Sequence, residues 1–202
     1  MRALAQIKVE RNIDGIEGLC VITPRVFEDS RGYFMETYNA NSMREAGFDI
    51  TFVQDNQSMS TRGVLRGLHF QKQYPQTKLV RVIRGEVYDV AVDLRPGSPT
   101  YGRYHGELLT EANKRQFLIP RGFAHGFLVL SETAEFCYKC DDFYHPDDEG
   151  GLAIATDYEE NDFLYDEIGS GLKVNQMRNE KRELFEQLEE YYELLIMMRP
   201  GN

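Results

Sequence analysis

The chain has 202 residues, 42% of them hydrophobic, and a formal net charge of −10 from 33 acidic and 23 basic side chains. One globular domain of this size buries a substantial core, and the acidic surplus argues against non-specific nucleic-acid binding, which needs Lys and Arg along one face. No apolar run reaches the roughly 18 residues of a membrane span, so we expect a soluble, cytoplasmic protein. The three cysteines are too few for a disulfide framework and agree with a reducing compartment.

The first three quarters of the chain are expected to be mainly β. Short runs rich in Val, Ile, Phe and Tyr alternate with turn signals such as Arg84-Gly85 and Pro120-Arg121-Gly122. Such runs predict strands at residues 18–22, 32–38, 51–57, 63–70, 78–84, 86–94, 103–109, 114–119, 126–130 and 134–140. Many short strands at this spacing favour a sandwich, barrel or jelly roll. One helix is expected among them, at residues 41–46, with Gly47 at its C-terminal end.

The last part of the chain has a different period. Its apolar residues recur at helical spacing, as Met177, Leu184, Leu188, Tyr191 and Leu195. This spacing predicts an amphipathic helix over residues 175–198, ended by Pro200-Gly201. We expect its glutamate-rich opposite face to be solvated. The chain is therefore divided into a β domain, residues 1–152, and a C-terminal extension, residues 153–202, that ends in a helix.

Polar residues interrupt the apolar strand predicted at residues 63–70. Strand alternation puts Arg66 on one face and His69, with Gly67, on the other. An Arg and a His within an apolar strand need partners, and Gly67 permits another group to approach closely. This strand is therefore a candidate for carrying ligand-binding or catalytic groups.

Two other strands contain residue types that carry chemistry. Alternation puts Asp89 and Asp93 on one face of the predicted strand 86–94, where they are either solvated or line a ligand cavity. Cys137 and Cys140 form a CxxC pattern, but within a strand their sulfurs point to opposite faces, and there is no second pair. Metal binding or redox chemistry is therefore not expected of them.

Segments spread along the β region resemble the dTDP-4-dehydrorhamnose 3,5-epimerase family, in that family's order and spacing. They are residues 52–56, 64–71, 78–81, 85–93, 98–102, 111–116, 119–127 and 134–139, and the resemblance spans residues 15–152. It implies a jelly roll of the cupin type (a double-stranded β-helix), a homodimer whose strands exchange between subunits, and no metal or organic cofactor. It also implies inversion of C3 and C5 of a dTDP-linked 4-keto-6-deoxyglucose through an enolate, on the route to dTDP-L-rhamnose.

The resemblance implies roles for the residues that match the family's motifs. His69 stands where the family has its base, Tyr138 where it has the opposed acid, and Lys78 where the enolate oxygen is stabilised. Arg31 and Arg66 match positions that bind the diphosphate, and with Lys78 they are expected to form a local positive site. Other substrate-contacting positions match Glu36, Gln54, Asp55, Asn56, His125, Glu149, Lys181 and Tyr144, whose ring corresponds to one that stacks on the nucleotide base. His105 and His145 are expected at the surface.

The family pattern fails beyond residue 152, where Arg182 stands at the position of an aspartate that orients the base. A carboxylate on the second nitrogen of a histidine base fixes its tautomer and stabilises the imidazolium. Three explanations are open: Glu183 or Asp157 supplies the carboxylate, Asp89 supplies it, or catalysis is impaired.

The leading hypothesis is therefore a 3,5-epimerase. The alternatives are an epimerase that inverts only C3 of a related nucleotide sugar, and a nucleotide-sugar-binding module without turnover. A metal-dependent cupin oxygenase is disfavoured, because the chain lacks the closely spaced histidines of a cupin metal site.

Overall fold

The computed structural model describes residues 6–151. The expected C-terminal helix lies outside these residues, as do Asp157, Lys181, Arg182 and Glu183. The helical elements are η1 (Ile13–Gly15), α1 (Ala40–Glu45) and η2 (Pro146–Asp148). The strands are β1 (Ile7–Arg11), β2 (Cys20–Pro24), β3 (Val26–Asp29), β4 (Gly32–Met35), β5 (Gln54–Thr61), β6 (Leu65–Gln71), β7 (Lys78–Arg84), β8 (Glu86–Asp93), β9 (Tyr104–Thr110), β10 (Gln116–Ile119), β11 (Phe123–Val129), β12 (Thr133–Cys140) and β13 (Glu149–Gly151).

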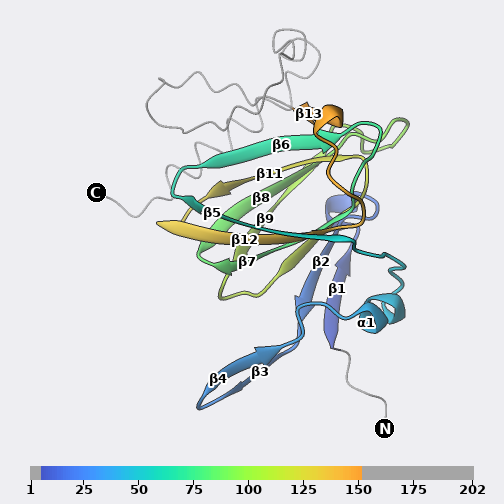
Figure 1. Ribbon diagram of the computed structural model, residues 1–202. Helices are drawn as coiled ribbons and strands as arrows, with labels where there is room; N and C mark the ends of the chain where they lie inside the picture. The colour runs from blue at the N-terminus through green and yellow to red at the C-terminus, as the bar shows by residue number, and fades with distance from the viewer. Residues whose placement is uncertain (1–5, 152–202) are drawn as a thin grey trace.

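Two antiparallel sheets face each other (Figure 1). One has the strand order β1-β2-β10-β7-β12-β5, and the other has the order β13-β6-β11-β8-β9. Neighbours in each sheet come from distant parts of the sequence, which is the connectivity of a jelly roll. The mainly β, jelly-roll prediction is thus confirmed.

The main hydrophobic core fills the space between the two sheets. Val80, Phe117 and Phe136 come from the six-stranded sheet, Val87 and Leu109 come from the five-stranded sheet, and each is fully buried. Their positions follow strand alternation, since each inward residue is flanked by residues of the opposite face. This core joins the sheets and leaves polar side chains to line only one part of the space between them.

Helix α1 covers part of the outer face of the six-stranded sheet. Its Met43 packs with Cys20, Ile22, Leu79 and Leu118, which come from β2, β7 and β10. Asn39 caps the helix, because its side chain accepts hydrogen bonds from the backbone of residues 41 and 42. The helix predicted at residues 41–46 is therefore present one residue earlier. It is also the longest helix of residues 6–151, and its six residues fall far short of a membrane span.

Most of the predicted strands are present within a few residues, and β7 has the predicted limits. Three strands were missed, namely β1, β3 and β13. The last of these contains Gly150 and Gly151, which have little intrinsic strand propensity. It is a strand because its backbone pairs with β6, with Gly151 opposite His69.

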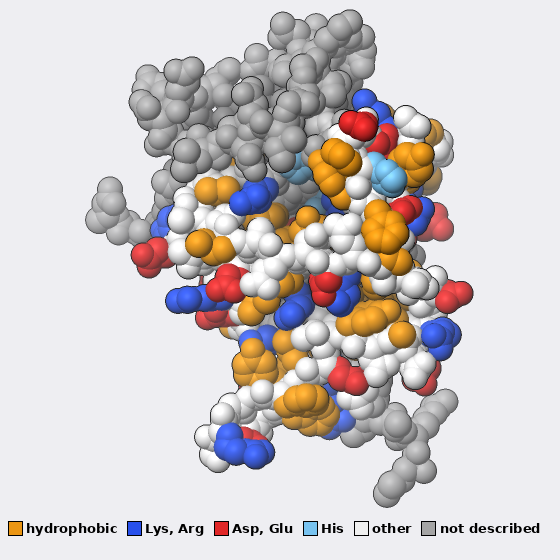
Figure 2. All heavy atoms as spheres, viewed as in Figure 1, with side chains coloured by type: hydrophobic (Ala, Val, Ile, Leu, Met, Phe, Trp, Pro, Cys, Tyr) orange, Lys and Arg blue, Asp and Glu red, His pale blue; other side chains and the backbone are white. Residues whose placement is uncertain are grey.

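Strands β3 and β4 form a hairpin that extends away from the two sheets (Figure 1). The hairpin pairs only with itself within the described residues, from Val26 opposite Met35 to Asp29 opposite Gly32. It exposes Phe34 at 67% and Phe27 at 43% of their surfaces. On the face drawn in Figure 2, acidic and basic side chains are interspersed over the body of the molecule. An isolated two-stranded hairpin is marginally stable in water. The exposed aromatic rings of the hairpin β3–β4 therefore mark a surface suited to further contacts.

Candidate active site

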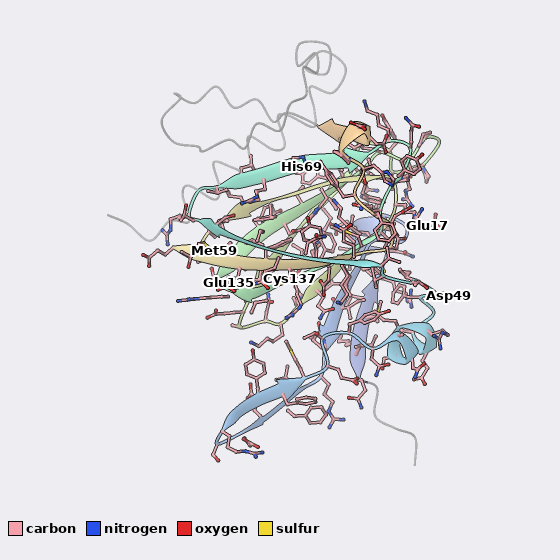
Figure 3. The ribbon with its side chains drawn as sticks, viewed as in Figure 1. Glu17, Asp49, Met59, His69, Glu135 and Cys137 are labelled. Atoms are coloured by element: carbon pink, nitrogen blue, oxygen red, sulfur yellow. The ribbon has the colours of Figure 1, made fainter. Side chains whose placement is uncertain are left out.

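A cavity of about 580 Å³ lies between the sheets. Nine of the predicted site residues line it: Gln54, Asp55, Asn56, Arg66, His69, Lys78, His125, Tyr138 and Tyr144. They come from β5, β7 and β12 of one sheet, from β6 and β11 of the other, and from the segment after β12. Figure 3 labels His69 on β6. The fold thus gathers residues that are up to 90 positions apart in sequence, such as Gln54 and Tyr144.

Arg66 and His69 both line this cavity, although strict alternation predicted opposite faces. The reason is an extra residue in β6: Phe127 pairs with Arg66 and His125 pairs with His69, so three steps along β6 match two along β11. Such a bulge reverses the alternation on one strand. It coincides with a close approach of two glycines, since a Cβ on Gly126 would lie 2.5 Å from the Arg66 carbonyl oxygen. The predicted face of Arg66 relative to His69 was therefore wrong.

His125 is held by a buried carboxylate. Its Nε2 lies 3.0 Å from both oxygens of Asp89, and Asp89 is fully buried. Burial raises the pKa of Asp89 above its usual range, while His125 and Lys78 partly offset this effect. Asp89 was one of three candidates for the carboxylate that supports His69, and the partner that the structure gives it is His125. Asp89 and Asp93 both face the interior, so they are not solvated.

Tyr138 and Lys78 stand on neighbouring strands opposite β6. The Lys78 Nζ lies 6.0 Å from the centre of the Tyr138 ring. Burial raises the pKa of Tyr138, with the neighbouring Cys140 acting in the same direction. The phenol is therefore neutral at physiological pH and can donate a proton. Arg66, whose Nε donates to Ser60 Oγ at 2.9 Å, is a second cation of the same cavity.

Amide side chains form a chain of hydrogen bonds along one wall. The Tyr144 backbone N–H donates to Gln54 Oε1 at 3.1 Å, and Gln54 Nε2 donates to Asn56 Oδ1 at 3.0 Å. Asn56 Nδ2 lies 3.9 Å from the Cys140 sulfur. These contacts fix the orientation of both amides, and they connect the segment of Tyr144 to the cavity wall.

Cysteine chemistry and metal binding were not predicted for this region. Cys20, Cys137 and Cys140 are all free and buried, and burial raises the pKa of the Cys140 thiol to about 11. A buried thiol of high pKa is a poor nucleophile. Within residues 6–151, no cluster of three or more His, Cys, Asp or Glu side chains is arranged to hold a metal ion.

Two predicted site residues of the described part, Arg31 and Glu36, are not in the lining of this cavity. Arg31 lies on the projecting hairpin, where it pairs with Asp29 at 2.6 Å. Glu36 follows that hairpin and accepts a hydrogen bond from Asn39. Glu149 belongs to β13, where its backbone lies opposite Gln71, and Lys181 lies outside the described residues. The expected positive site of Arg31, Arg66 and Lys78 is therefore not assembled within one chain.

Two histidines differ from their predicted surface positions. The side chain of His105 is only 14% exposed, and its Nδ1 lies 2.6 Å from Asp14. His145 is half-buried and its ring stacks on Tyr74 with centres 4.1 Å apart.

Sequence reasoning also missed Gln71, Gln76 and Phe136 in the cavity lining. Strand period could have identified Phe136, which is two residues before Tyr138 on β12.

Comparison with known proteins identifies the family. A model of dTDP-4-dehydrorhamnose 3,5-epimerase matches residues 14–165, and a model of a family of unknown function matches residues 143–200. A dTDP-4-dehydrorhamnose 3,5-epimerase of Methanothermobacter thermautotrophicus is 57% identical over 137 residues, which are 68% of this chain and 74% of that protein. A dTDP-4-dehydrorhamnose 3-epimerase of Streptomyces niveus is 43% identical over 140 residues, 68% of each chain.

Solved structures agree with these relatives. The crystal structure of a dTDP-6-deoxy-D-glucose-3,5-epimerase from Legionella pneumophila, in complex with dTDP-4-keto-L-rhamnose, matches with a TM-score of 0.69 and 51% identity. The match covers 72% of this chain and 77% of that chain. The cupin type of jelly roll is thereby confirmed. With more than half of its length matched by the family model, this chain belongs to the dTDP-4-dehydrorhamnose 3,5-epimerase family of isomerases.

Proposed function

We propose that this protein inverts C3 and C5 of dTDP-4-keto-6-deoxyglucose by removing a proton from one face of the sugar and returning one to the other. The observation that carries this proposal is the position of His69 and Tyr138 on facing sheets of one cavity, with Lys78 beside Tyr138. A base and an acid on opposite sides of a sugar ring are what inversion through a planar enolate requires.

In each inversion, His69 takes the proton from the carbon next to the 4-keto group, and the electron pair of that C–H bond moves into an enolate. Lys78 stabilises the negative charge on the enolate oxygen. Tyr138 then donates its phenolic proton to the opposite face of the same carbon. Proton exchange with solvent restores neutral His69 and the Tyr138 phenol, so the reaction needs no cofactor.

The remaining residues of the cavity bind the nucleotide. Arg66 is assigned to the diphosphate, because a guanidinium stays charged and matches phosphate oxygens. Gln54, Asp55, Asn56 and His125 are assigned to polar contacts with the substrate, and Tyr144 to stacking on the thymine base. Glu149 and Lys181 remain assigned to substrate contacts on the resemblance alone. His125 is supported in this role by its contact with Asp89, which fixes the orientation of the ring.

We also propose that the protein acts as a homodimer in which the hairpin β3–β4 of one copy serves the cavity of the other. The support is the separation of Arg31 from the cavity of its own chain, together with the exposed aromatic rings of the hairpin. Arg31 would then meet the diphosphate beside Arg66, and Glu36 would follow into the same interface. We expect the protein to work in the cytoplasm, a reducing compartment, which its three free cysteines support.

Incubation with dTDP-4-keto-6-deoxyglucose in deuterated water tests the proposed function. Deuterium at both C3 and C5 is the expected result, measured by mass spectrometry and NMR. Label at C3 alone would instead assign the C3-only reaction, which is the activity named for the Streptomyces niveus relative. Binding of the nucleotide sugar without any exchange would show a module that has lost turnover.

A further inference from the structure

Two connecting segments border the mouth of the cavity. Residues 72–77 join β6 to β7, and residues 141–148 follow β12 and end at β13. Gln76 from the first segment and Tyr144 from the second line the cavity. The relative position of the two segments therefore determines the shape of its entrance.

Hydrogen bonds join the two segments beside the strands. The Thr77 backbone N–H donates to Asp141 Oδ1 at 2.6 Å, and the Asp141 N–H donates to the Thr77 carbonyl at 3.2 Å. Gln76 Nε2 donates to the Asp142 carbonyl at 2.9 Å. This end of the connection is an extension of the pairing between β7 and β12.

The middle of the connection is formed by His145. Its ring stacks on Tyr74 at an interplanar angle of 21°, and its carbonyl accepts a hydrogen bond of 2.7 Å from Gln71 Nε2. Along the chain, Tyr144 lies between Asp142 and His145. Since Tyr144 is 46% exposed, packing against the core does not by itself fix the direction of its ring.

Asp148 joins residues 141–148 to the start of residues 72–77. Its side chain is buried, and its two oxygens accept hydrogen bonds of 2.9–3.0 Å from the backbone N–H of Gln73 and 2.9 Å from that of Tyr74. No Lys, Arg or His of residues 6–151 forms an ion pair with Asp148, so backbone dipoles stabilise this carboxylate. A buried carboxylate in such a position holds the segment of Tyr74, and through the ring of Tyr74 it holds His145.

We propose that Asp148 is a positioning residue for nucleotide binding: it holds residues 72–77 against residues 141–148 and thereby fixes Tyr144 at the cavity mouth. This inference rests on the proposed function, in which the Tyr144 ring stacks on the thymine base. Asp148 acts through Tyr144 and not on the reacting carbons, because His69 and Tyr138 are held by strands β6 and β12.

The test replaces the carboxylate by its neutral isostere. Asp148→Asn places an amide NH₂ group against one of the two backbone N–H donors, so the segment must shift. We expect the affinity for dTDP, measured by calorimetry, to fall about five- to tenfold, since base stacking on an aromatic ring contributes at this level. KM for the nucleotide sugar should rise in proportion while kcat stays within about twofold.

Asp147→Asn is the matched control, because it removes the same charge from the adjacent, exposed residue. It should leave dTDP affinity within about twofold of the wild type. Tyr144→Ala provides the second background: if Asp148 acts through Tyr144, then Asp148→Asn should weaken dTDP binding no further in that background. An equal loss in both backgrounds, or unchanged affinity in Asp148→Asn, would overturn the inference.

Should Asp148→Asn fail to fold, Tyr74→Leu tests the same connection by removing the stack on His145. It should also weaken dTDP binding, and unchanged affinity would contradict the inference. Failure of the inference and failure of the proposed function differ in outcome. Wild-type protein that binds dTDP and exchanges deuterium keeps the proposed function whatever Asp148→Asn does, whereas wild-type protein that does not bind dTDP overturns both.

Discussion

Several charged and aromatic side chains are buried and paired in the two-sheet body, but those of the hairpin β3–β4 are exposed. In the body, charged groups have fixed partners: Asp89 and Asp93 are fully buried, and Asp93 is bound by Arg95, Ser98 and Thr100. In the hairpin, Phe27, Tyr33 and Phe34 are exposed, and among the described residues Arg31 forms an ion pair only with Asp29.

The difference agrees with the proposed dimer, in which the hairpin of one copy serves the cavity of the other. The body gathers the proposed base His69, the proposed acid Tyr138 and the cation Lys78 around one cavity, so the proposed proton transfer needs residues of one chain. An exposed ion pair of the Arg31–Asp29 kind contributes little to stability, because water screens it. The exposed aromatic rings of the hairpin therefore support the proposed contact with a second copy.

Cross-complementation of two inactive variants tests whether the hairpin of one copy serves the cavity of the other, and it should give the largest effect. Arg31→Ala should lower kcat/KM about 100-fold, because a charged contact to the diphosphate is lost. Mixing and refolding it with His69→Ala should restore about a quarter of the wild-type activity, since half of the dimers are mixed and each has one intact site. The assay is product formation after refolding the two chains together. If the mixture stays inactive, Arg31 serves the cavity of its own chain and the proposed exchange is wrong.

Gly126→Ala tests whether the bulge in β6 organises the body. The added Cβ would lie 2.5 Å from the Arg66 carbonyl oxygen, and backbone atoms cannot move aside as a flexible side chain can. We expect the free energy of unfolding in urea to fall by about 2 kcal/mol, the cost typical of overpacking. Gly97→Ala is the control, because a Cβ there meets nothing within 4 Å. Although Gly97 has a positive φ, its replacement should cost less, about 1 kcal/mol. Equal losses would show that the glycine contact between β6 and β11 has no special role.

The His105 cluster should give the smallest effect, on the pH dependence of stability. Burial lowers the pKa of His105, but Glu107 and Asp14 outweigh this and raise the pKa above its usual value. A raised pKa in the folded state stabilises the protein fully below the unfolded value of about 6.5, and this stabilisation is lost as pH rises through the folded value. Unfolding in urea from pH 5 to 9 should show this decline in the wild type. His105→Gln should reduce it, and an unchanged slope would contradict the assignment.

The sequence predicted the elements whose signal is local. β7 is rich in β-branched residues and ends before the turn at Gly85, and α1 has Asn39 and Gly47 at its ends. The strands that were missed depend on their partners. β13 contains two glycines and exists through its pairing with β6.

The candidate site was predicted in its composition more fully than in its geometry. The motif match identified nine residues that the fold brings to one cavity, because neighbouring strands carry them to the same end of the sheets. The common orientation of Arg66 and His69 could not be derived, since an extra residue in β6 depends on the register with β11. The pairing of Asp89 with His125 required the same cross-strand information, which places Phe127 opposite Asp89 and His125 two residues away. Asp148 gave no sequence signal, because its partners are backbone N–H groups.

Tyr138→Phe tests whether His69 removes the proton and Tyr138 returns one to the opposite face of the sugar. In deuterated water with dTDP-4-keto-6-deoxyglucose, this variant should still exchange the C3 proton through His69, but it should invert the carbon at least about 100-fold more slowly, because the acid on the opposite face is missing. His69→Ala should lose both exchange and inversion while dTDP binding stays within about threefold. Exchange with retained configuration in Tyr138→Phe is the expected result, and inversion at the wild-type rate in that variant would show that Tyr138 is not the acid.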